Sequence, residues 1–566
     1  MNDNQSRLTL EEYETDFKNI RLKSKLSISF NRIAFIIFIF FVITIIFSIK
    51  TIYLGSQKQQ SKVNIYKSDF RSSIIDRSDN ILTQSVITTN IGINPKLIID
   101  KKKLLINLKI IFPNKNFEDI SIKIEKGKFF YLEKKISKKK YDQLFLLGDK
   151  SIIEEQKISR IYPQKELFSH VIGQIDDNNK GISGIEKSFD YELRSNKEPL
   201  KLTLDINLQY IIRQELLKFT EIFKNIGSTA ILMNVNSGEI LSMVSLPDFD
   251  LNKRTDLSDK IYLNRATKGV YELGSVFKTF TLASALNEGV VDVNTEFLDL
   301  ERAIRCGKHT IREYDEKIPT DLTAEQILIR SGNIGSVRIA QKIGVEKHEM
   351  FLKKIGVLNK INFDLEEIGQ PIPFDWGKCK LATVSFGHGI TTTPLQLAKG
   401  YAIISNGGYD VDPTLIKKSN LQKKNKILKK GVSEKINSTL RKIVSTKEGT
   451  ANFANIEGYE VGGKTGTAQK SINGVYSKNK INTFVAVFPT SKPKYILLVL
   501  LDEPKPSLDY VYHYKDGSGW RYKGTPYNTA GWTSVEIAGK IIEKIGPILA
   551  INKIDFYDNH VVKKSF

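Results

Sequence analysis

Ser275 and Lys278 stand three positions apart, directly after Gly274. On a helix, residues at this spacing share one face a turn apart, so the lysine amine can lie beside the serine hydroxyl. A serine hydroxyl is a poor nucleophile that needs a base within hydrogen-bonding distance. A lysine becomes such a base when burial or a nearby cation lowers its pKa. The alternative is that Ser275 only caps a helix, a position that serine favours.

Two further motifs favour the catalytic interpretation. Ser-x-x-Lys and Ser-x-Asn each occur several times in the chain, but Lys-Thr-Gly occurs once, at Lys464–Gly466, and is followed by Thr467. Only one Ser-x-Asn, at Ser331–Asn333, lies between Ser275 and this motif. The order S-x-x-K, S-x-N, K-T-G is the signature of penicillin-binding proteins and serine β-lactamases.

The motifs lie in a region that predicts both helices and strands. Residues 202–219 place apolar side chains at helical spacing, and two β-prone runs within 228–247 flank a predicted hairpin turn. Such a pattern indicates α/β layers around one sheet. If the Lys-Thr-Gly segment is a strand, Thr465 and Thr467 share one face. Further predictions are a helix at 271–287, a helix break at 331–333, strands at 459–470, 481–489 and 495–504, and a closing helix at 537–551.

A long apolar segment lies near the N-terminus. Residues 33–49 contain no charge, and after Lys50 the apolar character continues to Leu54. About 20 apolar residues span a bilayer core, so residues 33–54 predict a retained transmembrane helix, because the apolar region of a cleaved signal peptide is shorter. Basic residues are in excess before the span, which predicts a cytoplasmic N-terminus and an external C-terminal portion.

The composition restricts the partners. The chain has 566 residues and a net charge of +22, but its lysines are spread widely. No zinc-finger or RNP signature occurs, so we expect a membrane or an acidic polymer, and no nucleic acid, as the partner of this charge. The histidines form no cluster with cysteines, so no metal site is predicted. Cys306 and Cys379 could pair, which the sequence does not decide.

The sequence resembles the class B penicillin-binding proteins, which are peptidoglycan transpeptidases without a glycosyltransferase domain. Residues 71–86 resemble the family's entry to its pedestal domain, and residues 181–193 its G-x-x-G-L-E box. Residues 237–252, 385–408 and 448–470 follow the family's transpeptidase domain. The likeness therefore extends well beyond the three short motifs.

The resemblance implies four segments. These are a cytoplasmic tail (1–32), a transmembrane helix (33–54), a β-rich periplasmic pedestal of the dimerisation type (55–200) and a transpeptidase domain (201–566). The last is expected to be a serine β-lactamase-like α/β domain, with a mixed antiparallel sheet flanked by helices. A pedestal of this length leaves no room for a glycosyltransferase domain, which excludes a bifunctional class A enzyme.

Roles for individual residues also follow from the resemblance. Ser275 is the implied acylated nucleophile, Lys278 its base, and Ser331 a proton relay toward the leaving amine. Lys464 is the second cation of the site. The backbone N–H groups of Ser275 and Thr467 form the implied oxyanion hole, and no metal or cofactor is needed. Substrate contacts are implied at Asn333, Thr465, Gly466 and Thr467.

The implied reaction cross-links stem peptides that end in D-Ala–D-Ala, and β-lactams are the implied inhibitors. Residues 385–398 resemble the septal, or division, form of the family more than the elongation form. The implied partners are therefore the membrane, a SEDS-type glycan polymerase and other division proteins. The alternatives left open are an elongation-type enzyme and a β-lactam-binding sensor or scaffold that does not cross-link. A β-lactamase is disfavoured because the resemblance supplies no deacylating base.

Leu273 and Gly332 depart from the family pattern, and the role of the loop at 505–527 is not decided by the sequence. Leu273 stands where the family often has proline, and Gly332 where serine is common. Neither residue supplies the implied chemistry, so we expect both to affect loop geometry. Residues 505–527 are rich in tyrosine, and we interpret them as a surface loop packed by its own aromatic side chains.

Overall fold

The computed structural model describes residues 25–56, 70–253, 259–307, 309–417, 425–472, 475–513, 519–520 and 527–561. It divides into two compact units, residues 1–67 and 68–566. In the first unit, helix α2 (Lys25–Ser56) contains the predicted span and extends beyond it at both ends. Its segment Arg32–Tyr53 is long and apolar enough to cross a membrane, with a mean hydropathy of 2.8. Most of the predicted cytoplasmic tail, residues 1–24, lies outside the described residues.

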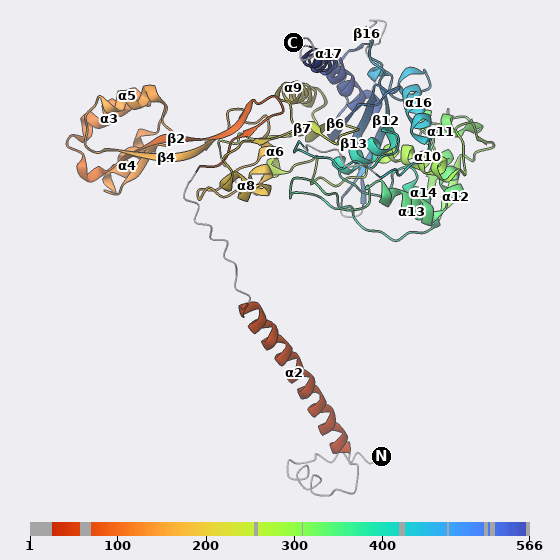
Figure 1. Ribbon diagram of the computed structural model, residues 1–566, viewed down its shortest axis with the longest axis horizontal. Helices are drawn as coiled ribbons and strands as arrows, with labels where there is room; N and C mark the ends of the chain where they lie inside the picture. Colours follow the sequence, from red (N-terminus) through yellow and green to blue (C-terminus); the bar gives the residue numbers. More distant parts are fainter. Residues whose placement is uncertain are drawn as a thin grey trace. The chain divides into compact units, whose positions relative to one another are not determined.

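The second unit is built around a five-stranded antiparallel sheet in the order β12-β13-β14-β6-β7 (Figure 1). The hairpin of β6 and β7 forms as predicted, and Gly238 in its turn adopts a φ of +79°. Strand β14 then pairs with β6 along its whole length, from Tyr495 opposite Asn234 to Asp502 opposite Gly227. The strands are β6 (Gly227–Asn234), β7 (Ile240–Leu246), β12 (Gly462–Ile472), β13 (Val475–Phe488) and β14 (Tyr495–Asp502).

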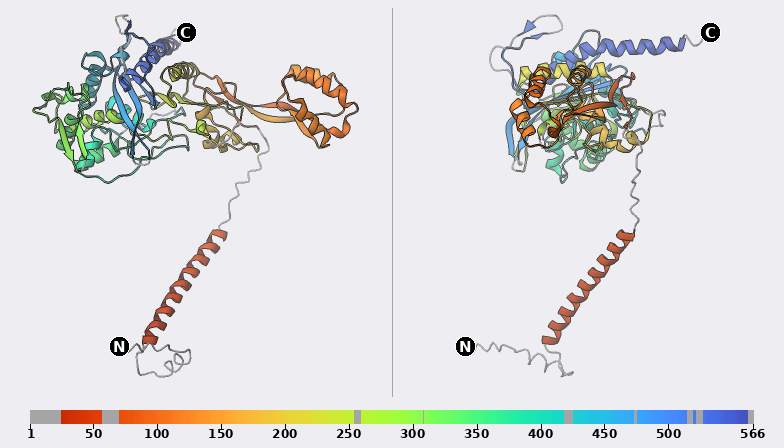
Figure 2. Two further views of the ribbon diagram at one scale, coloured as in Figure 1. Left: turned by 180° about the vertical axis from the view of Figure 1, so that it is seen from behind. Right: turned by 90° about the vertical axis from the view of Figure 1, so that its left-hand side faces the viewer.

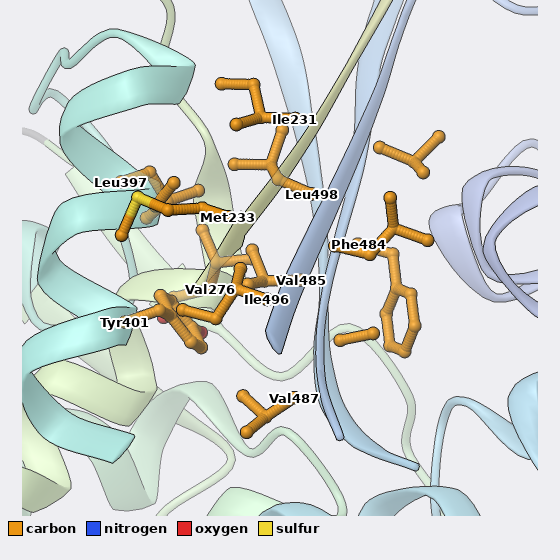
Figure 3. Close-up of a cluster of buried hydrophobic side chains, with 14 of the residues drawn as sticks. Ile231, Met233, Val276, Leu397, Tyr401, Phe484, Val485, Val487, Ile496 and Leu498 are labelled. Atoms are coloured by element: carbon orange, nitrogen blue, oxygen red, sulfur yellow. The ribbon is translucent and has the colours of Figure 1, made fainter. Parts of the chain in front are cut away.

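Helices cover both faces of this sheet. Successive residues of a strand point to opposite faces, and Figure 3 shows Phe484 on one face and Leu397 and Tyr401 of helix α15 on the other. All three side chains are fully buried. Helices α9 (Ile206–Phe223) and α17 (Ser534–Val561) pack together as one layer. The other helices of this region are α10 (Phe277–Glu288), α11 (Ala324–Ile329), α12 (Asn333–Ile343), α13 (Val345–Lys354), α14 (Lys378–Val384), α15 (Pro394–Ser405) and α16 (Val432–Ser445).

The N-terminal part of the second unit contains a long antiparallel ribbon of β2 and β4 (Figures 1 and 2). At one end of the ribbon, α3, α4 and α5 enclose a small separate core that includes Leu104, Leu108 and Leu144. Residues 71–86, which resemble the entry to the pedestal domain, contain β1 and the start of β2, and these two strands pair in antiparallel fashion. The elements are β1 (Ile74–Ile75), β2 (Ile81–Ile93), β3 (Phe130–Glu133), β4 (Ile152–Ile161), β5 (Leu200–Lys201), α3 (Lys101–Ile111), α4 (Phe117–Glu125), α5 (Lys138–Phe145), α6 (Ser169–Ile172), α7 (Gly184–Ser188) and α8 (Asp190–Ser195).

The helix predicted at 271–287 begins later than expected. A short 3₁₀ turn, η3 (Gly274–Val276), comes first, and α10 begins at Phe277. Gly274 has a φ of +62°, a left-handed conformation that an α-helix does not contain. The helix therefore cannot extend back through this residue, and Ser275 lies in the turn before it.

Candidate active site

Ser275 lies in η3, a turn that packs directly against strand β12. A side chain at Gly274 would place its Cβ atom 2.9 Å from the Thr467 carbonyl oxygen, and one at Gly466 would clash with the Leu273 carbonyl oxygen. Glycine at both positions therefore allows the strand and the turn to approach each other closely. Ser275 itself is half-buried, and its Oγ makes no hydrogen bond to the described residues.

Helix α15 contacts the first turn of α10 through a tyrosine hydroxyl. The Tyr401 hydroxyl of α15 donates to the Val276 carbonyl at 2.7 Å and lies 2.9 Å from Thr279 Oγ1. Burial raises the pKa of Tyr401 far above its usual value, so the hydroxyl keeps the proton that it donates. This contact holds the residues on both sides of Lys278 in place.

Lys278 is buried, with 1% of its surface exposed, and its helix α10 packs against α12, α13 and α16. Its Nζ donates to Asn333 Oδ1 at 2.7 Å, to Ser331 Oγ at 3.2 Å and to the Ser331 carbonyl. Burial lowers its pKa to about 7, against a smaller opposite effect of the Glu313 carboxylate. An amine with this pKa is partly neutral near pH 7, as a general base must be. These hydrogen bonds of Lys278 Nζ go to Ser331 and Asn333, and among the described residues none goes to Ser275 Oγ.

Lys464 lies on β12 and is also fully buried. Its Nζ donates to Ser331 Oγ at 2.9 Å and to the Thr465 carbonyl at 3.1 Å. Burial and, to a smaller extent, the charge of Lys278 hold its pKa well below the usual value. Because a hydroxyl oxygen has two lone pairs, Ser331 Oγ accepts from both amines and bridges them.

The break between two helices places Ser331 in this position. Helix α11 ends at Ile329 and α12 begins at Asn333, as the sequence predicts. Ser331 adopts a φ of +59°, a left-handed conformation that costs roughly 1–2 kcal/mol for a residue with a Cβ atom. The turn directs both Ser331 and Asn333 toward Lys278.

The Lys-Thr-Gly segment is part of a strand, as predicted. The Thr465 hydroxyl lies 2.8 Å from Thr450 Oγ1, and Thr467 Oγ1 accepts the N–H of Ala530 at 2.9 Å. Thr465 is buried and Thr467 is half-buried. The elements that carry the predicted site residues are therefore in contact with one another. Ser275 lies in η3, Lys278 on α10, Ser331 and Asn333 in the 331–333 turn, and Lys464, Thr465, Gly466 and Thr467 on β12.

Three residues beside the site were not identified from the sequence. Glu272 accepts the N–H of Gly389 at 2.9 Å and contacts the Tyr476 hydroxyl at 3.1 Å. The His388 ring stacks on Tyr476, with 4.6 Å between the ring centroids. They come from three distant segments, so no local pattern indicates their proximity. Together they connect the segment before η3 to the 385–389 loop and to β13.

Two further contacts concern features that the sequence left open. Cys306 and Cys379 are joined by a disulfide, with their Cα atoms 5.4 Å apart. In the aromatic loop 505–527, the Tyr510 and Tyr512 rings pack edge to face at 4.8 Å. The loop is packed by more than its own aromatic residues, because Tyr510 also packs on Phe219 of α9, and Tyr512 packs on Phe453 and Trp532. Residues 514–518 and 521–526 lie outside the described part.

Two family models match the chain. The family model described as "Penicillin binding protein transpeptidase domain" matches residues 228–518, and the model "Penicillin-binding Protein dimerisation domain" matches residues 68–215.

Several curated relatives are similar over most of their length. "Probable peptidoglycan D,D-transpeptidase FtsI" of Caulobacter vibrioides is 29% identical over 85% of this chain and 82% of the relative. "Probable peptidoglycan D,D-transpeptidase PenA" of Neisseria gonorrhoeae is 27% identical over 77% and 80%. "Peptidoglycan D,D-transpeptidase FtsI" of Buchnera aphidicola subsp. Baizongia pistaciae is 29% identical over 87% and 94%. Because the chain matches both the dimerisation and the transpeptidase models, and its relatives carry these names, it belongs to the class B penicillin-binding proteins of the FtsI type.

Proposed function

We propose that this protein is a peptidoglycan D,D-transpeptidase that forms its acyl-enzyme on Ser275. The observation that carries the proposal is the pair of buried amines, Lys278 and Lys464, bridged by the Ser331 hydroxyl next to the turn of Ser275. The family and the names of the relatives support the same activity.

In the first step, Ser275 Oγ attacks the carbonyl carbon between the two terminal D-alanines of a donor stem peptide. Neutral Lys278 takes the hydroxyl proton. The backbone N–H groups of Ser275 and Thr467 stabilise the oxyanion, each contributing on the order of 3 kcal/mol. When the C–N bond breaks, the Ser331 hydroxyl passes its proton to the leaving nitrogen and takes up the proton that Lys278 received, so D-alanine departs and Lys278 is neutral again.

In the second step, the amine of a neighbouring stem peptide attacks the ester carbonyl on Ser275. The amine gives up a proton to Lys278, the C–O bond breaks, and Ser275 regains its proton. The product is an amide cross-link, so no oxidant or metal enters the balance. Lys464 and the hydroxyls of Thr465 and Thr467 receive the terminal carboxylate of the donor, while Asn333 holds its backbone and Gly466 lets it approach β12.

The proposal also covers the location and the membrane orientation of the protein. Helix α2 anchors the chain in the inner membrane, with residues 1–32 in the cytoplasm and the catalytic domain in the periplasm. The excess of basic residues before the span supports this orientation. A SEDS-type glycan polymerase and other division proteins are the proposed partners, because residues 385–398 resemble the septal form. Protease added outside spheroplasts should remove the large domain, and its protection would rule out this orientation.

A fluorescent penicillin tests the activity directly. The wild-type protein in isolated membranes should become labelled, and mass spectrometry of the labelled peptide should locate the adduct on Ser275. Ser275→Ala should lose labelling while its thermal unfolding midpoint stays unchanged. Labelling of Ser275→Ala at the wild-type rate would disprove the assignment of the nucleophile.

A further inference from the structure

Three consecutive residues outside the recognised motifs hold the turn that carries Ser331. They are Arg312, Glu313 and Tyr314. Arg312 is the last residue of β10 (His309–Arg312), which forms a hairpin with β9 (Ala303–Cys306), and the other two residues follow it. The Arg312 carbonyl accepts from Asn333 Nδ2 at 2.8 Å. The Tyr314 hydroxyl donates to the Arg330 carbonyl at 2.7 Å. The segment therefore contacts the turn on both sides of Ser331.

Glu313 makes the central contacts. One carboxylate oxygen accepts the N–H of Asn333 at 2.6 Å, and the other accepts the N–H of Ile334 at 2.8 Å. These N–H groups belong to the first turn of α12, where no helical carbonyl is available to them. A carboxylate at this end also interacts favourably with the helix dipole. Glu313 thus fixes the start of α12, and with it the direction of the Asn333 side chain.

This support acts on the proposed base. Asn333 Oδ1 accepts a bond from Lys278 Nζ, so its position determines where that amine lies. The charged groups that face Lys278 are Glu313, which interacts with it electrostatically, and Lys464, whose pKa is lowered by burial and by the charge of Lys278. The negative charge of Glu313 favours the protonated form of Lys278.

The supporting hairpin is itself tethered. Cys306 at the end of β9 forms the disulfide with Cys379 on α14. Helix α14 leads into the 385–389 loop, in which Gly387 packs against the carbonyl of Gly274 so closely that a Cβ atom would clash. The disulfide therefore links two segments covalently. One is the β9–β10 hairpin, which leads to Glu313 beside the Ser331 turn, and the other is α14, which leads to the loop packed against the turn of Ser275.

We propose that Glu313 is a positioning residue for the acylation step, acting from a hairpin that the Cys306–Cys379 disulfide ties to α14. It holds the 331–333 turn so that Asn333 and Ser331 place the Lys278 amine for proton transfer. This inference rests on the proposed function, because it concerns how the base of that reaction is positioned.

The test measures the second-order rate constant for acylation by a fluorescent penicillin in the full-length protein between about pH 5.5 and 9. In Glu313→Gln the amide cannot accept both N–H groups, so the plateau rate should fall roughly tenfold to a hundredfold. Loss of the negative charge should also lower the pKa of Lys278 from its value of about 7, which moves the acidic limb of the profile to lower pH. A loss of folded protein would reduce the labelled fraction without moving that limb.

Two further variants complete the experiment. Glu313→Asp keeps the charge but is too short to reach both N–H groups, so the limb should stay in place while the plateau falls. Glu316→Gln removes an exposed carboxylate three residues further along and should leave both unchanged. A wild-type plateau and limb in Glu313→Gln would overturn the inference; if that variant does not fold, a wild-type plateau in Glu313→Asp would overturn it. An unlabelled wild-type protein would instead contradict the proposed function.

Discussion

At the scale of single residues, the site depends on two lysines that are removed from water. Burial disfavours a charged amine, and the two ammonium groups next to Ser331 would also repel each other. Burial lowers the pKa of both Lys278 and Lys464, and the charge of Lys278 lowers the pKa of Lys464 further. The bridging Ser331 hydroxyl provides hydrogen bonds to both amines whichever of them holds the extra proton.

Lys278→Arg tests whether deprotonation is required. A guanidinium keeps the positive charge but does not lose its proton in proteins. Since general-base catalysis contributes typically 10²- to 10⁴-fold, acylation by penicillin should slow by roughly that factor. Lys353→Arg, at an exposed position of α13 in an ion pair with Glu349, is the matched control and should acylate normally. Near-wild-type acylation of Lys278→Arg would assign Lys278 a structural role only.

At the scale of elements, the proposed catalysis depends on the close contact between η3 and β12. The two segments are almost 200 residues apart in the chain, yet glycines at their interface permit contact between backbones. The pairing of β12 with β13, from Gly462 opposite Val487 to Gln469 opposite Lys480, sets the register of the Lys-Thr-Gly segment. A shift of one residue would turn Lys464 to the other face of the sheet.

Gly466→Ala tests this contact. Its Cβ atom would clash with the Leu273 carbonyl oxygen, so β12 must move away from the turn of Ser275. We expect acylation to fall by about 10²-fold, because the N–H groups of Ser275 and Thr467 would no longer converge. Gly377→Ala is the control, since a Cβ atom there meets open space and its φ of 178° suits any residue. Equal acylation rates in the two variants would show that the contact is not needed.

At the scale of the whole molecule, one apolar helix accompanies a large unit that carries the site. The helix is rich in isoleucine and phenylalanine, and within residues 33–49 Thr44 and Ser48 form a pair of small residues at four-residue spacing. Such pairs allow close packing of membrane helices. Thr44 and Ser48 therefore mark the face along which another membrane helix can approach this one closely.

Depletion in the native organism tests the septal assignment. We expect septation to stop while elongation continues, which gives filamentous or chained cells of normal width. Microscopy after depletion measures this directly, with re-expression of the wild-type protein restoring division and of Ser275→Ala failing to do so. Rounded, widened cells would assign the protein to elongation and leave the chemistry at Ser275 unaffected.

The sequence by itself determined the features that depend on local pattern. The order of the three motifs predicts the chemistry, and residues 459–470, which include the Lys-Thr-Gly segment, are predicted as a strand. The polar and glycine residues at 331–333 predict a break between two helices. Each motif and each of these elements is a stretch of neighbouring residues, and the order of the motifs is a property of the chain, so none of them requires knowledge of the packing.

Only the tertiary structure decided which distant groups meet. The start of α10 at Phe277 depends on the conformation of Gly274, and the bridging of two amines by Ser331 depends on burial. The support by Glu313 and the Cys306–Cys379 disulfide join segments 20 and 73 residues apart. The sequence contains these side chains but not their distances, because distances between segments follow from how the whole chain packs.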